Sequence, residues 1–252
     1  LSFLRRNLIG TSFIMLDKNI LTFEQVCFSY CRSISSLTLK GLLLKDQVTS
    51  RHAIFQNLSL ALEKGKRYAL VGDNGAGKSS LALMVMKKIL PESGCVNLNG
   101  KALSLFSDSD DLFQNLDVKG FIKVYLLLIW PTLVPSEVKE YRDEILKSCL
   151  LTGVKNNKMS SLSKGMRQKL LLSIYTAKAI DLLIIDESLS GIDSSFFPKF
   201  KERLNACLGE FGTLVLVDHN KSVLEDFCDE VLCLKNGSLT YFDIKDLKLH
   251  VN

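Results

Sequence analysis

Apolar residues follow two periods along this chain, one typical of strands and one typical of helices. Residues 19–30 alternate apolar with polar side chains and are rich in β-branched and aromatic residues, which predicts a strand. The segments 182–187 and 212–219 each hold a continuous apolar run, the pattern of parallel strands buried on both faces. Residues 53–72 predict two further strands around the turn EKGK. We therefore expect a sheet that is mostly parallel.

Helical periodicity appears in three parts of the chain. A helix is expected from 78 to 90, ended by Pro91. From about 117 to 178 the pattern becomes helical over three successive segments, as an inserted helical lobe would require. A further helix over 194–209 lies between the two apolar strands, so that these elements complete a right-handed βαβ unit.

Two hairpins are predicted by Asn-Gly turns, one within 94–103 and one within 231–243. Residues 31–50 are rich in Ser and Leu without a clear period, and either a hairpin or a loop insertion fits them. The order of elements predicts an α/β fold, with a mostly parallel sheet flanked by helices. An antiparallel β subdomain and an inserted helical subdomain at about 110–178 complete the expected architecture.

The length of 252 residues fits one large domain, or one core domain with an inserted lobe. We expect the domain at 19–246, an N-terminal extension at 1–18 and a short tail at 247–252. Two arginines and an apolar stretch near the start faintly suggest a signal peptide, but no small-residue cleavage site follows. Met15 looks like a natural start, so residues 1–14 are interpreted as a loosely held extension or an upstream misreading.

Composition excludes several classes of protein. The net charge of +5 is mild and is not gathered in a basic stripe, so no nucleic-acid partner is expected. Seven cysteines without zinc-type spacing favour free thiols in a reducing compartment. No window approaches the roughly 18 uninterrupted apolar residues of a membrane span. The longest candidate begins at Phe121, contains Lys123 and stops at Pro131, which favours a buried helix.

The stretch LVGDNGAGKSSLAL at 70–83 satisfies the spacing G-x-x-x-x-G-K-[ST] between a predicted strand and a predicted helix. Its glycines let successive backbone N–H groups turn inward and form an anion-binding concavity at a helix N-terminus. Lys78 would reach the β- and γ-phosphates, and the Ser79 hydroxyl would coordinate Mg²⁺. The sequence therefore predicts a P-loop NTPase core that binds a nucleoside triphosphate with Mg²⁺. The expected nucleotide-binding residues of this loop are Gly72, Asp73, Asn74, Gly75, Ala76, Gly77, Lys78, Ser79 and Ser80.

The run LLIIDES supplies acidic residues at the end of an apolar strand. Asp186 would hold Mg²⁺ through water, and Glu187 stands where a base could orient the attacking water. Adjacent acids after a strand are often a plain strand end, but the pairing with the Lys78 loop favours the catalytic interpretation.

Four motifs in one order carry a resemblance to a family. LSKGMRQKL at 162–170 resembles the signature loop LSxGxxQ of ABC ATPases, and it lies between the phosphate loop and LLIIDE, as in that family. SGID at 190–193 is similar to the family's D-loop, and VLVDHN places His219 at the position of the switch histidine. The resemblance covers about residues 20 to 242.

This resemblance implies a mechanism in which two cassettes dimerise head to tail and clamp each ATP between a phosphate loop and the other subunit's signature loop. Ser163 and Gly165 would then contact the γ-phosphate of the partner's ATP, helped by the dipole of the helix that follows. Glu187 would be the general base, and His219 would hold the γ-phosphate and the attacking water. Tyr30 is a candidate for stacking on adenine, although an aromatic residue at a strand end fits a core position equally well.

The match departs from the family pattern in two places. Asp108 stands where the family has a Gln that joins the core to the helical lobe, and it could meet Mg²⁺ or water without donating a hydrogen bond. In the signature loop, Lys164 and Met166 replace the commoner Gly and Gln, a variant similar to that of exporter-type subunits.

The resemblance implies the ATP-hydrolysing subunit of an ABC transporter, with export favoured over import and with separate membrane-spanning permease subunits. The protein would be cytoplasmic and peripheral at the inner face of the cell membrane, in a homodimer or in a heterodimer with a second ABC ATPase. The helical lobe would dock the permease near Phe113, Phe121 and Tyr125. Two alternatives stay open, a soluble non-transport ABC ATPase and a hydrolysis-impaired regulatory nucleotide-binding module.

Overall fold

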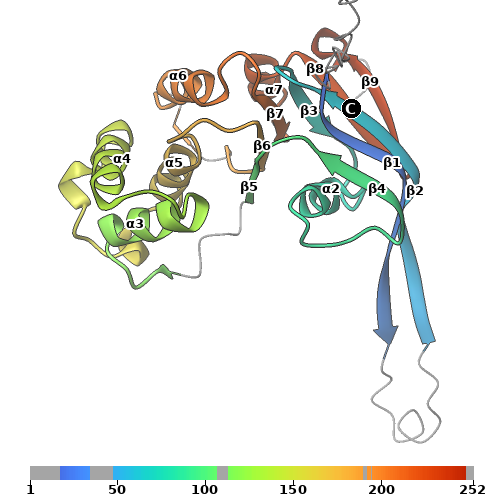
Figure 1. Cartoon of the computed structure of the whole chain (residues 1–252), viewed down its shortest axis with the longest axis horizontal. Coiled ribbons are helices and arrows are strands. Elements are labelled where there is room, and N and C mark those ends of the chain that lie inside the picture. Colours follow the sequence, from blue (N-terminus) through green and yellow to red (C-terminus); the bar gives the residue numbers. More distant parts are fainter. Residues whose placement is uncertain (1–17, 35–47, 107–112, 190–191, 194, 248–252) are drawn as a thin grey trace, which may run out of the picture.

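A computed structural model describes residues 18–34, 48–106, 113–189, 192–193 and 195–247. Its strands and helices form two sheets with helices on either side (Figure 1). The strands are β1 (Asn19–Ile34), β2 (Val48–Glu63), β3 (Arg67–Val71), β4 (Ser93–Leu98), β5 (Ala102–Phe106), β6 (Leu182–Asp186), β7 (Thr213–Val217), β8 (Glu230–Lys235) and β9 (Ser238–Asp243). The α-helices are α2 (Lys78–Val85), α3 (Val118–Ile129), α4 (Pro135–Ser148), α5 (Lys164–Tyr175), α6 (Phe197–Leu208) and α7 (Lys221–Phe227). Short 3₁₀ turns are η2 (Thr152–Val154), η3 (Met159–Ser161) and η4 (Ile244–Asp246).

The larger sheet has the strand order β5-β6-β7-β3-β8-β9. Its strands are parallel from β5 to β8, and the edge strand β9 pairs antiparallel with β8. Its central strands are buried on both faces, as their continuous apolar runs predict. In β6, Leu182 and Ile184 belong to the core beneath α2, while Leu183 and Ile185 belong to the core that includes α3 to α7. The sheet thus separates two hydrophobic cores, and the predicted α/β fold is confirmed.

The smaller sheet is antiparallel, in the order β2-β1-β4. Strands β1 and β2 pair from Asn19↔Glu63 out to Ile34↔Val48, and this long hairpin extends beyond the rest of the molecule at the lower right of Figure 1. The strand predicted at 19–30 is therefore longer than expected, and part of the segment 31–50 is strand. Residues 35–47 of that segment lie outside the described residues.

Helices α3, α4 and α5 lie together at one side of the large sheet, away from the β1–β2 hairpin (Figure 1). The three helices predicted between 117 and 178 are present. Within the part of the chain that the structure describes, no helix is both long and apolar enough to cross a bilayer.

Two local predictions are wrong. Strands β4 and β5 do not form the hairpin expected at 94–103, because β4 pairs with β1 while β5 pairs with β6 in the other sheet. The carboxylate of Asp181 accepts a hydrogen bond from the Lys101 amide at 2.7 Å and directs the chain into the large sheet. Helix α2 ends at Val85, five residues before the predicted end, because Lys87 takes a left-handed conformation with φ of 55°.

Candidate functional site

The phosphate loop joins the end of β3 to the first turn of α2, as the sequence predicts. Two of its glycines have no room for a side chain. A Cβ on Gly72, at φ 154°, would lie 2.2 Å from the Leu234 carbonyl oxygen. A Cβ on Gly77, at φ 106°, would lie 2.5 Å from Cγ2 of Ile54. These contacts hold the loop tightly against β8 and β2, which fixes the direction of its backbone N–H groups.

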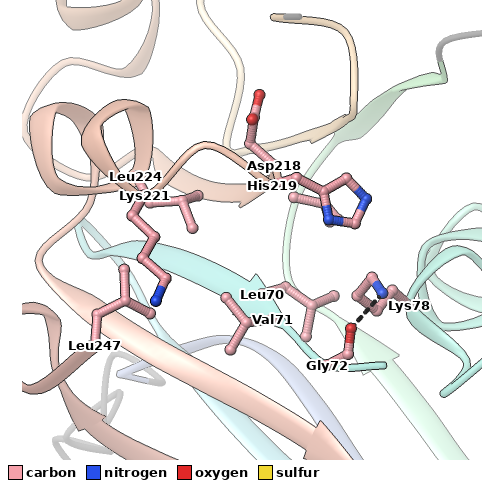
Figure 2. A pocket seen from close by; sticks show the side chains of 10 residues that line it. Leu70, Val71, Gly72, Lys78, Asp218, His219, Lys221, Leu224 and Leu247 are labelled. Atoms are coloured by element: carbon pink, nitrogen blue, oxygen red, sulfur yellow. Dashed lines mark hydrogen bonds between the residues drawn. The ribbon is translucent and has the colours of Figure 1, made fainter. Parts of the chain in front are cut away.

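The Lys78 ammonium occupies the inside of this loop. The residue is 9% exposed, and its Nζ donates to the Gly72 carbonyl oxygen at 2.7 Å (Figure 2). It also donates to the Asp73 carbonyl oxygen at 3.1 Å. The cation therefore lies next to the N-terminus of α2, where partial positive charge from the unpaired helix amides adds to its own. A phosphate group would find both kinds of donor in one place.

The second feature of the site is a contact between Ser79 and Asp186. Asp186 ends β6, where its carboxylate is buried, and its Oδ2 accepts a hydrogen bond from the Ser79 hydroxyl at 2.8 Å. A hydroxyl and a carboxylate are oxygen donors of the kind that Mg²⁺ uses, with water and phosphate oxygens completing its octahedron. The donor set therefore fits Mg²⁺. Asp108, the third residue expected at the metal, lies outside the described residues.

Glu187 and His219 meet at the same edge of the sheet. Nε2 of His219 lies 3.1 Å from Oε1 of Glu187, and both side chains are about half-exposed or more, at 67% and 44%. The Glu187 amide donates to the Val217 carbonyl at 2.9 Å, and Glu187 has an unusual φ of 53°. A positive φ is disfavoured for residues other than glycine, and residues that adopt it are concentrated at functional sites.

A cleft of about 340 Å³ lies between the phosphate loop, Glu187 and the β1–β2 hairpin. Its lining is Tyr30, His52, Ile54, Asn74, Gly75, Gly77, Lys78, Ser79, Ser80 and Glu187. Tyr30 is 42% exposed, and its hydroxyl lies 3.2 Å from the Ser80 hydroxyl. The Tyr30 ring packs edge-on against Phe28 with centroids 4.9 Å apart. Of the two environments considered for Tyr30, the structure gives it a place in the cleft rather than in the core.

A smaller pocket of about 120 Å³ lies on the other side of Lys78, between the ends of β3 and β7 (Figure 2). His219 and Lys78 both line it, and Lys78 also lines the larger cleft, so the Lys78 side chain stands between the two hollows. The neighbouring Asp218 carboxylate points away from the phosphate loop in Figure 2, and its Oδ1 accepts a hydrogen bond from the Asn220 amide at 2.8 Å.

The signature-type loop lies elsewhere. Ser163 is the N-cap of α5, and its Oγ accepts a hydrogen bond from the Met166 amide at 3.2 Å. Ser163 is exposed and Gly165 is half-buried, and neither is among the described residues that line the cleft at Lys78. The structure thus does not bring Ser163 and Gly165 into the described lining of the cleft of their own chain.

Asp193, of the motif at 190–193, forms an ion pair with Lys169 of α5. Hydrogen bonds from Lys169 and from the Ser195 hydroxyl hold the pKa of the Asp193 carboxyl below its usual value. Ser190 and Gly191 lie outside the described residues. The described part of this motif thus links the middle of α5 to the segment after β6.

Sequence reasoning missed two residues of the cleft, His52 and Ile54. Both precede the motif on β2, and neither belongs to a recognisable pattern. Alternation along the strand, read together with Tyr30 on the paired strand, is the signal that could have found them.

Docking of the permease is expected near Phe113, Phe121 and Tyr125, and the structure buries the last two of these side chains. Phe121 is 0% and Tyr125 7% exposed, and their rings stack with centroids 4.4 Å apart. Phe113 is partly buried and packs edge-on against Tyr125 at 5.9 Å. The three rings stabilise the packing between α3 and its neighbours instead of presenting a free surface.

Comparison with known proteins places the chain in a family. A family model described as ABC transporter matches residues 55–190, more than half of the chain. A teichoic acids export ATP-binding protein, TagH of Lactococcus lactis, is 30% identical over 184 residues, covering 73% of this chain and 39% of that protein. A methionine import ATP-binding protein, MetN of Photorhabdus laumondii, is 29% identical over 202 residues, covering 75% of this chain and 59% of that protein. The chain thus spans less than two thirds of the length of either relative.

Two solved structures share the fold at low sequence identity. An ATP-binding subunit of an ABC transporter has a TM-score of 0.71 at 19% identity, covering 91% of this chain and 92% of that one. A dimeric ATP-binding cassette in a post-hydrolysis state with ADP and Pi has a TM-score of 0.72 at 18% identity, covering 89% and 98%. With the family match, the phosphate loop and the acidic strand end in one cleft, these likenesses show that the chain belongs to the ABC transporter family, among its ATP-binding subunits.

Proposed function

We propose that this chain binds and hydrolyses ATP with Mg²⁺ and drives transport through separate membrane-spanning subunits. The observation that carries the proposal is the convergence of Lys78, the Ser79–Asp186 pair and the Glu187–His219 pair at one edge of the large sheet. A cation inside a phosphate loop, a metal-type oxygen pair and a carboxylate–imidazole pair together meet the needs of phosphoryl transfer to water.

The roles follow from the positions. The Lys78 ammonium and the first amides of α2 would neutralise the β- and γ-phosphates, exchanging the present carbonyl contacts for phosphate oxygens. Ser79 and Asp186 would hold Mg²⁺, which neutralises phosphate charge when bound. Because Ser79 and Asp186 now contact each other at 2.8 Å, their side chains must separate slightly to admit the ion.

Glu187 would accept a proton from the attacking water, and His219 would orient the water and the γ-phosphate. The exposure of the Glu187 carboxylate leaves it accessible to a water molecule in the cleft, and the 3.1 Å contact with His219 fixes its direction. Positioned base catalysis of this kind contributes roughly 10²- to 10⁴-fold to a rate. Tyr30 would stack on the adenine at the hairpin end of the cleft.

We further propose that the active unit pairs two cassettes, this chain with itself or with a second ABC ATPase, peripheral at the inner face of the membrane. Ser163 and Gly165 would complete the site of the partner, which is consistent with their absence from the described cleft lining of their own chain. Export is the proposed direction, supported by the signature variant at Lys164 and Met166 and by the similarity to a teichoic acids exporter. The methionine importer among the relatives supports the opposite direction.

Steady-state ATPase measurements on the purified protein test the proposal. Glu187→Gln should lower the rate by about 100-fold or more, because the base is lost while the size of the side chain is kept. Lys78→Ala should abolish binding of ATP measured by calorimetry. Glu202→Gln on the exposed face of α6 is the matched control and should retain the wild-type rate.

An unaltered rate in Glu187→Gln would refute the assignment of the base. Binding of ATP without turnover in the wild-type protein would instead favour a regulatory nucleotide-binding module.

A further inference from the structure

Two aromatic side chains from opposite strands of the long hairpin border the hairpin end of the cleft. Tyr30 of β1 and His52 of β2 are paired residues in the antiparallel register. Directly opposed residues share a face of the sheet, with Cβ atoms about 5 Å apart. Both line the cleft with the phosphate loop, and both are exposed, Tyr30 at 42%.

The position of His52 is fixed through its own strand. Ile54, two residues further along β2 and in the lining of the same cleft, is 8% exposed and lies against Gly77 so closely that a Cβ there would approach Ile54 at 2.5 Å. On the other strand, the Tyr30 hydroxyl contacts Ser80 of α2 at 3.2 Å. The hairpin thus contacts the phosphate loop through Ile54 and α2 through Tyr30, one contact on each strand, and these contacts place His52 in the same cleft as Lys78.

The chemistry of the cleft divides along its length. At one end are the ammonium of Lys78 and the oxygens of Ser79 and Glu187, which suit phosphate and metal. On the side of the β1–β2 hairpin the lining consists of two flat rings, Tyr30 and His52, and the aliphatic Ile54. Planar π-systems on a firm support are the kind of surface on which a nucleobase stacks.

From this arrangement we infer that His52 is a second base-contacting residue, which holds the purine of the nucleotide together with Tyr30. The imidazole supplies stacking area. Its ring nitrogens also add hydrogen-bonding groups on the β2 side of the cleft, opposite the Tyr30 phenol of β1. The inference rests on the proposed nucleotide site, and it adds a residue that no sequence motif contains.

Calorimetric titration of the full chain with the β,γ-imido analogue of ATP, and separately with inorganic tripolyphosphate, tests the inference. His52→Ala should weaken the affinity for the ATP analogue about fivefold or more, the effect of losing one stacking contact, and leave tripolyphosphate binding unchanged. His52→Phe should recover most of the lost affinity. Arg51→Ala is the matched control, because Arg51 is equally exposed, adjacent on the strand and, by alternation, on the other face.

The outcomes separate this inference from the proposed function. If Lys78→Ala abolishes binding of both ligands while His52→Ala behaves like Arg51→Ala, the nucleotide site stands and the role of His52 is refuted. If His52→Ala weakens tripolyphosphate as much as the ATP analogue, the residue acts on the loop and not on the base, which also refutes it. If Lys78→Ala binds both ligands normally, the proposed function itself fails.

Discussion

The hydroxyl of Ser104 on β5 shows how a single polar atom is placed in an apolar interior. Ser104 is 8% exposed, and its Oγ is buried without a hydrogen-bond partner in the part of the chain that the structure describes. Thr213, at the start of β7, is fully buried too, but its Oγ1 donates to the Glu63 carbonyl at 3.1 Å. Both hydroxyls are therefore buried, but only that of Thr213 has a hydrogen-bond partner among the described residues.

This difference gives opposite expectations for two small substitutions. Ser104→Ala should raise the free energy of unfolding by up to about 1 kcal/mol, because an unsatisfied polar group leaves the interior. Thr213→Val should lower it by about 1 kcal/mol, because the Glu63 carbonyl loses its donor. Urea unfolding of both variants against wild type measures the shifts, and a destabilised Ser104→Ala would contradict the assignment.

At the scale of residues, the predictable part of the site is the part that chemistry forces into a fixed spacing. Gly72, Gly77 and Lys78 can be found from the sequence because a loop that surrounds phosphate needs those residue types at those intervals. His52 has no such interval, since its place depends on the register between β1 and β2 and not on its neighbours in sequence. Tyr30 falls between the two cases, and only its exposure distinguishes a cleft residue from a core residue.

Among the helices, Arg203 of α6 joins elements that are far apart in sequence. Its Nη1 donates to Oε1 of Glu144 on α4 at 2.6 Å, and its Nη2 donates to the Ser173 carbonyl on α5 at 3.1 Å. The guanidinium is 12% exposed, while Glu144 is 55% exposed. The contact with the α5 carbonyl is therefore the more sheltered of the two.

Removing the Arg203 contacts should destabilise α4 and α5 more than the large sheet. Arg203→Met keeps the length of the side chain and should lower the free energy of unfolding by about 1–2 kcal/mol, because the Ser173 carbonyl loses a charged donor. Amide hydrogen exchange should become faster in α4 and α5 and remain unchanged in β6.

Glu144→Gln is the control for the exposed half of the interaction. Surface ion pairs are worth about 0–1 kcal/mol, so this variant should differ little from wild type. Equal losses in both variants would show that the ion pair, and not the backbone contact, is the important part.

At the scale of elements, the sequence predicts whether a segment is a helix or a strand better than it predicts where the element ends or which strand it pairs with. The apolar runs of β6 and β7 identify buried parallel strands because no other short element tolerates such composition on both faces. The Asn-Gly turn at 99–100 predicts a hairpin from local propensity, but Asp181, eighty residues away, binds the Lys101 amide and draws β5 into another sheet. Long-range contacts of this kind are not encoded in any local pattern.

For the whole molecule, the separation between the cleft at Lys78 and the N-cap of α5 has a consequence for assembly. If both loops contact one ATP, the second loop must come from another chain. The Glu187→Gln protein, which would retain ATP, should therefore form dimers when Mg-ATP is added and return to monomers when it is removed.

Size-exclusion chromatography with light scattering measures this equilibrium. Lys78→Ala should stay monomeric at every ATP concentration, and Ser163→Arg in the Glu187→Gln background should prevent dimers without changing the binding of ATP to the cleft. ATP-independent mass in all variants would contradict a nucleotide-bridged pair.

The family and the general architecture follow from the order of motifs, because that order reflects how the strands must be arranged around one phosphate loop. The projection of the β1–β2 hairpin and the position of the lobe relative to the sheet depend on side-chain packing between distant segments, and the sequence gives no direct sign of either.

The three residues between β4 and β5 connect the smaller sheet to the larger sheet and contact the end of α3. A Cβ on Gly100 would lie 2.6 Å from the Asp181 carboxylate, the Lys101 amide binds that same carboxylate, and the Lys101 ammonium donates to the Ile129 carbonyl at the end of α3 at 2.7 Å. The Lys101 ammonium also lies 5.4 Å from the Trp130 ring, and burial lowers the pKa of this lysine. This three-residue connection therefore contacts both the large sheet and the end of α3, and a change in the position of α3 would act directly on the backbone at this corner.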